Sequence, residues 1–339
     1  MDVVLIPAYE PDAQLIRVVD ELFDRGFKIV VVNDGSGDQY DSIFAAVSQK
    51  ADIVAYDKNR GKGAALKAGM VYIRDELPAC NYFITCDADG QHLPCDVDRV
   101  RKSLYAGNDF VLTVRQRKGK IPLRSRFGND LSRVVYTLLT DRYLPDNQSG
   151  LRGFTRKNLD WLISVPKNNY DYEMNVLYYA AKMGVKIKTL PIDVIYIQDN
   201  ASSHFRPVAD TVRIYKSLFS LARGTLFSIV IAEIFLLVME LFYSDLCMVM
   251  LIPAAGALAL GVRLAFDRFF LFRSFSGYHF WQTIRNTVVH YAVYTALCLL
   301  LDCLLPAVPV FVSFNIVYLV CKIARFFLYL LLYKVTHKK

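Results

Sequence analysis

Apolar and polar residues alternate along the first 200 positions in a pattern that differs from the rest of the chain. Short apolar runs typical of buried strands fall at residues 3–6, 28–33, 52–56, 82–86 and 110–114. Between them lie stretches with apolar residues at helical spacing, of which Leu15 to Phe23 is one. Strands that alternate with amphipathic helices predict an α/β domain built on a parallel sheet.

The last third of the chain is far more apolar. Residues 225–339 carry only 9 Lys and Arg and 5 Asp and Glu, whereas residues 1–224 carry 31 and 27. Four stretches have the length and composition of membrane-spanning helices, at about 225–243, 246–265, 286–305 and 308–328. Basic residues gather between the second and third stretches and at the C-terminal tail, so the positive-inside rule predicts that the N-terminal domain faces the cytoplasm.

A basic amphipathic segment at 207–221 joins the two parts. It is either an ordinary surface helix or a helix that lies on a membrane surface, and the apolar stretches that follow at once favour the second. The predicted organisation is therefore an α/β domain at 1–204, an amphipathic linker at 205–224 and an all-α four-helix transmembrane domain at 225–339.

Composition narrows the functional classes further. The net charge is +8 and 54% of the residues are hydrophobic, which excludes a disordered chain. The seven cysteines form no CxxC pair, which argues against a zinc site or a disulfide framework. The first residues show neither a basic n-region nor a small-residue cleavage site, so no signal peptide is expected. Positive charge beside apolar stretches points to anionic lipid and phosphate-bearing substrates, not to nucleic acid.

The strongest chemical signal is Asp87-Ala88-Asp89-Gly90-Gln91-His92, directly after the fourth predicted strand. Two carboxylates spaced i, i+2 at a strand end can share one hard cation such as Mg²⁺ or Mn²⁺, which completes its shell with substrate phosphates. The alternative is a turn whose aspartates cap a helix that begins near Pro94.

Further polar clusters end the other predicted strands. Pro7, Ala8, Tyr9 and Glu10 follow the first strand, and Asp34 follows the second. The stretch Asn59 to Ala65 precedes a helix; its glycines permit close backbone approach, and Lys62 near a helix N-terminus suits a diphosphate. Because ligands bind beyond the carboxyl ends of strands in open α/β sheets, these clusters predict one nucleotide site.

This constellation over residues 1–204 resembles the family 2 glycosyltransferases of GT-A fold, and especially the polyprenyl-phosphate sugar synthases similar to dolichyl-phosphate mannose synthase. The resemblance implies that Asp87, Asp89 and Gln91 hold the metal, and that Pro7, Ala8, Tyr9, Glu10, Asp34 and Lys62 line the nucleotide-sugar pocket together with Asp87.

The same resemblance implies an acceptor side. Arg115 and Arg126 match arginines that bind the lipid phosphate, with Arg124 and Ser149 nearby; a solvated basic face is the alternative for the arginines. Asp89, Arg115 and Arg126 are accordingly the expected catalytic residues.

Asp146 and Arg152 either order the floor of the acceptor site or pair with each other. A phosphate acceptor is already ionised, so no general base is needed, and Glu173 is either a base for an alcohol acceptor or a paired helix residue. The loop at 198–204 departs from the family pattern.

The predicted function is an inverting transfer of a hexose from a UDP- or GDP-sugar to polyprenyl (undecaprenyl) phosphate, with Mg²⁺ or Mn²⁺, at a bacterial-type cytoplasmic membrane, for cell-surface glycan modification. The membrane part resembles a GtrA-like domain, which implies either transport of the lipid-linked sugar or anchoring, and a homo-oligomer is possible. The rival predictions are a membrane polysaccharide synthase and a lipid-sugar carrier or scaffold with a nucleotide-binding domain.

Overall fold

The apolar runs of the N-terminal part form a seven-stranded sheet in the order β3-β2-β1-β4-β6-β5-β7 in the computed structural model. The structure describes residues 1–116, 123–140, 142–193, 207–242, 248–271 and 277–304, together with the single positions 316, 317, 320, 323 and 327. The strands are β1 (Asp2–Ala8), β2 (Lys28–Asp34), β3 (Ala51–Tyr56), β4 (Tyr82–Thr85), β5 (Phe110–Gln116), β6 (Arg152–Thr155) and β7 (Ile187–Asp193). All five predicted strands are confirmed, to within two residues at either end.

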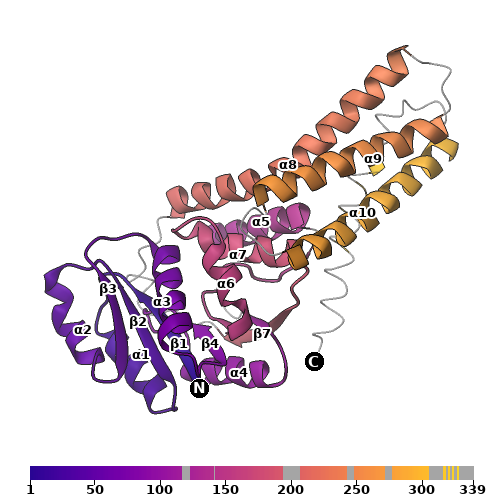
Figure 1. Ribbon diagram of the computed structural model, residues 1–339. Helices are drawn as coiled ribbons and strands as arrows, with labels where there is room; N and C mark the ends of the chain where they lie inside the picture. Colours follow the sequence, from indigo (N-terminus) through magenta and orange to yellow (C-terminus); the bar gives the residue numbers. More distant parts are fainter. Residues whose placement is uncertain are drawn as a thin grey trace. The chain divides into compact units, whose positions relative to one another are not determined.

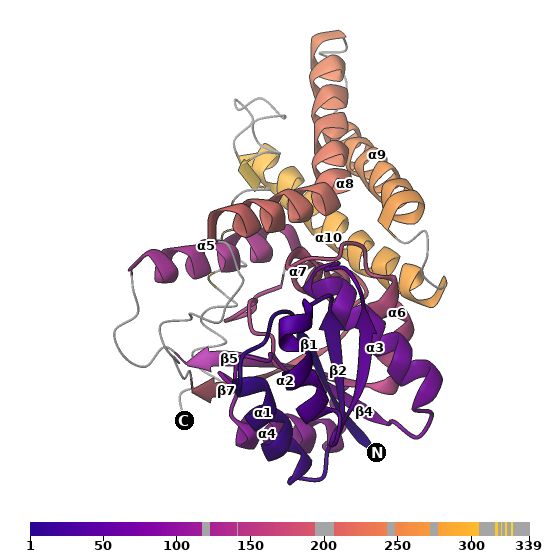
Figure 2. The ribbon, with the colours of Figure 1, turned by 90° about the vertical axis from the view of Figure 1, so that its left-hand side faces the viewer.

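The prediction of an all-parallel sheet is wrong in one strand. β1 pairs in parallel with β2 and β4, and β5 pairs in parallel with β7, but β6 runs antiparallel to both β4 and β5. Figure 2 shows β5 and β7 side by side. The reversal pairs the start of β6 with the end of β4, through Arg152 and Thr85. The chain that leads into β6 therefore arrives at the edge of the sheet where the aspartates follow β4.

Helices cover both faces of this sheet (Figure 1). The helices of the N-terminal part are α1 (Gln14–Phe23), α2 (Asp41–Val47), α3 (Lys62–Glu76), α4 (Pro94–Tyr105), α5 (Leu123–Thr140), α6 (Leu159–Ser164) and α7 (Asp171–Lys182), with short 3-10 turns η1 (Asp38–Tyr40) and η2 (Arg156–Asn158). Of these, α1, α3 and α4 contact its strands. Val4 and Ile6 of β1 belong to one core cluster with residues of α1, α2 and α4. Leu5 points to the other face, where α3 packs so closely that a Cβ on Gly69 would lie 2.1 Å from its Cδ1.

The apolar C-terminal part is helical wherever it is described. It contains α8 (Pro207–Phe242), α9 (Met248–Phe266), the π-helical turn η4 (Asp267–Leu271) and α10 (Gly277–Leu304). By length and composition two segments could cross a membrane, Ala209–Met239 and Met250–Phe270, and the apolar part of α10, Thr287–Leu300, is shorter. Four spans are thus not shown: most of the predicted stretch at 308–328 lies outside the described residues, as does the whole loop at 198–204.

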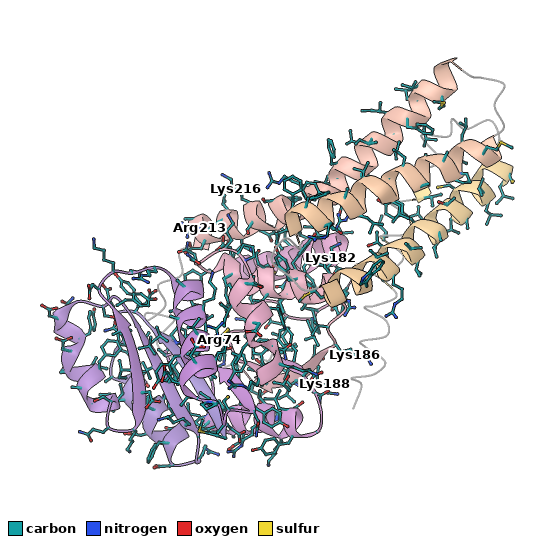
Figure 3. All side chains as sticks on the ribbon, viewed as in Figure 1. Arg74, Lys182, Lys186, Lys188, Arg213 and Lys216 are labelled. Carbon is teal, nitrogen blue, oxygen red and sulfur yellow. The ribbon has the colours of Figure 1, made fainter. Side chains whose placement is uncertain are left out.

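Contacts divide the protein into two compact units, which are described separately. One consists of Met1–Arg133, Leu144–Ala180 and Val185–Ser217, and the other of Val134–Tyr143, Ala181–Gly184 and Leu218–Lys339. The predicted amphipathic linker and the first predicted span are consecutive parts of one helix, α8. Arg213 and Lys216 are labelled on its first turns in Figure 3, and Arg213 forms an ion pair with the buried Asp210 at 2.7 Å.

Candidate active site

The aspartate pair that follows β4 lies in the first unit among four charged or titratable side chains from distant parts of the sequence. Lys62, the first residue of α3, places its Nζ 2.7 Å from Oδ1 of Asp87 and 2.9 Å from Oε2 of Glu173 on α7. His92 Nε2 lies 3.3 Å from the other oxygen of Asp87, and Arg152 NH2 lies 3.9 Å from Oε1 of Glu173. Charges of opposite sign therefore alternate from Arg152 through Glu173 and Lys62 to Asp87.

The second aspartate has a different environment. Asp89 Oδ1 accepts a hydrogen bond of 3.0 Å from the amide of Gln91, across a turn in which Gly90 has a left-handed φ of 72°. Burial and the negative charge of Asp87 raise the pKa of Asp89. Burial also opposes ionisation of Asp87, but the charges of Lys62 and His92 outweigh it and hold the pKa of Asp87 below its usual value.

The alternative role as helix caps does not apply to the described geometry. Helix α4 begins at Pro94, its N-cap position is Leu93, and no side chain caps it. The carboxylates of Asp87 and Asp89 face Lys62, His92 and the Gln91 amide instead.

A divalent cation fits this donor set. Carboxylate and amide oxygens are the ligands that Mg²⁺ and Mn²⁺ prefer, and Asp87, Asp89 and Gln91 offer only these. The two carboxylates are near enough for each to oppose the ionisation of its neighbour, a cost that a shared cation removes. Among the described residues no group of three or more His, Cys, Asp and Glu has the arrangement of a metal site. Remaining ligands would therefore come from Gln91, substrate oxygens and water.

Gly150 makes room for the first aspartate. It lies two residues before β6, and a Cβ added there would be 2.4 Å from Oδ2 of Asp87 and 2.8 Å from Oδ1. Its carbonyl accepts a 2.8 Å hydrogen bond from the hydroxyl of Thr85 at the end of β4. A side chain larger than hydrogen at 150 would displace the Asp87 carboxylate.

The residues predicted to bind the nucleotide gather at the ends of β1 and β2. Pro7 and Ala8 are the last residues of β1 and pair with Val32 and Asn33 of β2. Tyr9 and Glu10 follow; the Glu10 amide donates to Oγ of Ser36, at a left-handed φ of 47°. A hydrogen bond with Glu10 raises the pKa of Tyr9.

Asp34, which was predicted to line the nucleotide-sugar pocket, has internal hydrogen-bond partners. It is 2% exposed, and its carboxylate accepts hydrogen bonds from the Tyr56 hydroxyl at 2.6 Å and from the amides of Arg60 and Gly61 at 2.8 and 3.0 Å. The carboxylate thus fixes the loop before α3.

The glycines of that loop also differ from expectation. A Cβ on Gly61 would lie 2.6 Å from the carbonyl oxygen of Asn168, and one on Gly63 would lie 2.4 Å from Cβ of Tyr172. The Ala64 amide donates to the carbonyl of Asn168 at 2.9 Å. These glycines let the start of α3 pack against the chain before α7, and this packing brings Lys62 to Glu173.

Two of the predicted acceptor residues, Arg115 and Ser149, have internal partners in the structure. The Arg115 guanidinium binds Asp146 through two contacts, Nε to Oδ2 at 2.6 Å and NH2 to Oδ1 at 3.1 Å. Ser149 is 1% exposed and its hydroxyl bonds Thr113 at 2.5 Å, so its side chain does not reach the surface. The side chains of Arg124 and Arg126, on the first turn of α5, lie outside the described part.

Most of the ion pairs and hydrogen bonds between these side chains were not predicted from the sequence. Asp146 pairs with Arg115 and not with Arg152, whose Nε and NH1 donate to the carbonyls of Ser149 and Glu173 at 2.9 and 2.8 Å. Glu173 is a paired helix residue, one of the two roles considered for it. The place of His92, five residues after Asp87, was a usable signal. No sequence signal indicated the contact of Lys62 with Glu173, because that contact depends on how α3 and α7 pack.

Comparison with known proteins gives the family of the N-terminal part. The model of the family "Glycosyl transferase family 2" matches residues 3–160. A protein of Methanocaldococcus jannaschii without a characterised function is 31% identical over an alignment of 231 positions, which covers 66% of this chain and 92% of that protein. UDP-N-acetylglucosamine–dolichyl-phosphate N-acetylglucosaminyltransferase of Methanococcus voltae is 28% identical over 57% of this chain and 85% of its own length.

A solved structure is also similar. The crystal structure of glucosyl-3-phosphoglycerate synthase from Mycobacterium tuberculosis with Mn²⁺, UDP and phosphoglyceric acid is 18% identical, covers 65% of this chain and 78% of that chain, and has a TM-score of 0.49. The mixed sheet, the polar ends of β1, β2 and β4 and the sequence matches lead to one assignment. The chain belongs to glycosyl transferase family 2, as an enzyme whose N-terminal domain has the GT-A fold.

Proposed function

We propose that this protein transfers a sugar from a nucleoside diphosphate sugar to a polyprenyl phosphate at a membrane. The observation that carries the proposal is the aspartate pair at the end of β4, in a family 2 domain whose relative from Methanococcus voltae is named for transfer to dolichyl phosphate. Two helices in the same chain are long and apolar enough to cross a membrane, where a polyprenyl acceptor resides.

The donor side is assigned to the ends of β1 and β4. Asp87, Asp89 and Gln91 would hold Mg²⁺ or Mn²⁺, which when bound supplies positive charge to the departing diphosphate. Tyr9 and Glu10, just beyond β1, would contact the nucleotide. Asp34 acts indirectly in this proposal, because its carboxylate already holds the loop that carries Lys62.

The acceptor side is assigned to Arg115, Arg124 and Arg126. Arginine suits a lipid phosphate because its planar guanidinium donates two parallel hydrogen bonds. Asp146 already uses Arg115 in this way, so Arg115 would bind the phosphate with its remaining donors or exchange its partner. A phosphate acceptor needs no general base, in accord with a Glu173 carboxylate that Lys62 and Arg152 engage.

The finer features of the proposal are a hexose donor, inversion at the anomeric carbon and a cytoplasmic face of a bacterial-type inner membrane. A nucleophile that attacks opposite the leaving diphosphate gives inversion in a single displacement. The four-span, GtrA-like organisation of the C-terminal part belongs to the same proposal.

The test uses the purified full chain in detergent with radiolabelled UDP- and GDP-hexoses, undecaprenyl or dolichyl phosphate, and Mn²⁺ or Mg²⁺. Label that becomes organic-soluble, and no longer does so in the Asp89→Asn variant or with chelator, supports the proposal. Insoluble polymer would favour a polysaccharide synthase. Absence of any metal-dependent product with all donors and both lipids would favour a carrier.

A further inference from the structure

The Lys62 ammonium lies against the Asp87 carboxylate, where a bound metal ion would also lie. Its ammonium lies 2.7 Å from Asp87 Oδ1 and 2.9 Å from Glu173 Oε2, and its side chain is only 18% exposed. The ring of Tyr170 lies below it, with the centroid 5.8 Å from Nζ. The ammonium is therefore shared almost equally between the candidate metal ligand and a carboxylate of α7.

The backbone of Lys62 is fixed from both sides, so only its side chain can move. The amide of Gly61 donates to Asp34 at 3.0 Å, and the amide of Ala64 donates to the carbonyl of Asn168 at 2.9 Å. Gly63 packs against Tyr172 without room for a Cβ. Rotation of the Lys62 side chain can change its carboxylate partner without moving α3.

Glu173, the second partner of Lys62, also lies beside the buried Arg152. Arg152 is 3% exposed; its NH1 donates to the main-chain carbonyl of Glu173 at 2.8 Å, and its NH2 lies 3.9 Å from the Glu173 carboxylate. The Arg152 guanidinium is itself anchored through Nε to the Ser149 carbonyl at 2.9 Å. Glu173 thus offers the ammonium a second carboxylate whose main chain is held by Arg152.

The balance of charge favours an exchange. Three carboxylates (Asp87, Asp89 and Glu173) lie in the cluster with two amine or guanidinium cations, Lys62 and Arg152. A divalent ion at Asp87 and Asp89 would repel the Lys62 ammonium at close range, and Glu173 can receive that ammonium without a further move of the backbone.

We propose that Lys62 is an exchangeable internal counter-ion of Asp87, and that Glu173 is a positioning residue that receives the Lys62 ammonium when a divalent cation binds. The inference rests on the proposed function, because it takes Asp87 and Asp89 as the cation site. Under this proposal α7, through Glu173, affects the cation affinity of Asp87 and Asp89, although neither aspartate lies on α7.

The experiment measures Mn²⁺ affinity directly, from loss of the electron paramagnetic resonance signal of free Mn²⁺ on titration with the full chain in chelator-free detergent. The variants are Lys62→Met, the isosteric Glu173→Gln and the double variant. Lys188→Met and Glu76→Gln change the net charge equally at exposed sites, of which Lys188 is labelled in Figure 3. Asp89→Asn locates the bound ion.

The two single variants should change the affinity in opposite directions. Removal of Lys62 takes away a competing cation, and we expect Mn²⁺ to bind on the order of tenfold more tightly. Glu173→Gln leaves the ammonium to Asp87 alone, and we expect binding on the order of tenfold weaker. General misfolding would weaken binding in both variants, so opposite signs exclude it.

The double variant tests whether Glu173 acts through Lys62. In the Lys62→Met background, Glu173→Gln should lower the Mn²⁺ affinity by less than about threefold, because there is no Lys62 ammonium left for Glu173 to bind. An equal loss in both backgrounds, or unchanged or weaker binding in Lys62→Met, overturns the inference while the metal site stands. If the wild type binds no Mn²⁺, or Asp89→Asn binds it equally well, the proposed metal site fails and the inference fails with it.

Discussion

The contact between Gly150 and Asp87 allows the candidate metal site to be disturbed without altering any charge. In Gly150→Ala, the new Cβ would lie 2.4 Å from Asp87 Oδ2, and neither carboxylate oxygen would remain at an acceptable distance. Gly150 does not have a left-handed φ, so alanine adds no backbone strain there. Movement from 2.4 Å out to a 3.0 Å limit displaces the carboxylate oxygen by at least about 0.6 Å.

That displacement exceeds the tolerance of a site held to about half an ångström. A misplacement of about 1 Å costs roughly a hundredfold in rate, so we expect Gly150→Ala to weaken Mn²⁺ binding and sugar transfer by roughly ten- to a hundredfold, or about 1.4 to 2.8 kcal/mol. Mn²⁺ titration by paramagnetic resonance and transfer to lipid measure the two effects. Near-ultraviolet circular dichroism and the unfolding temperature show whether the fold is kept.

Gly37→Ala is the matched control. Its Cβ would meet Oε1 of Gln39 at 2.8 Å, but Gln39 has a long side chain that can turn away, and Gly37 lies far along the chain from the aspartates. We expect no change in Mn²⁺ affinity in this variant. If Gly150→Ala also binds Mn²⁺ with wild-type affinity, then the position of the Asp87 carboxylate does not set cation affinity and the assignment of Asp87 as a ligand is refuted.

Three further predictions concern other parts of the first unit. Asp34→Ala leaves two loop amides without their acceptor, so the free energy of unfolding should fall by about 2–4 kcal/mol in urea titrations; a loss below about 0.5 kcal/mol would contradict the loop-fixing role. Burial raises the pKa of Asp146, but the Arg115 guanidinium together with the backbone amides of Gln148 and Arg115 lowers it by more, so the net shift is downward. The stability that these contacts contribute is present above about pH 4 and lost as the pH falls further, and unfolding temperatures should show a shallower acid loss in Asp146→Asn. An equal acid loss in both proteins would contradict it. Burial raises the pKa of the Cys80 thiol to about 11, whereas Cys95 is exposed, so maleimide should label Cys95 in the folded protein and Cys80 only after unfolding, as peptide mass spectrometry would show; equal labelling rates would count against the described burial.

The strands that sequence reasoning found are those whose apolar character is continuous. β1 and β2 are buried between two layers of helices, and their valine and isoleucine runs are unambiguous. β6 escaped because Arg-Gly-Phe-Thr is short and mostly not apolar, although three of its four residues are buried. β7 contains Pro191, which a central strand would not tolerate; the sheet order places it at an edge.

The candidate site divides in the same way. The chemical type of Asp87 and Asp89 was readable because strand ends of an α/β sheet converge on one edge. The partners of these two aspartates could not be predicted from the sequence, because Lys62 and Glu173 meet through the packing of α3 beside the chain before α7. The internal partners of Asp34 were not readable from the sequence, because a carboxylate after a strand can accept hydrogen bonds from amides of its own protein as well as from a ligand.

The lysine between Asp87 and Glu173 also bears on how the protein is handled. Many acidic sites need their metal to remain folded, because uncompensated carboxylates repel one another. Here the Lys62 ammonium can neutralise a carboxylate when no metal is bound. Purification in EDTA should therefore leave the melting temperature unchanged and inactivate the enzyme reversibly. Preparations inactive after chelation would then be recoverable by dialysis against manganese, with no refolding step.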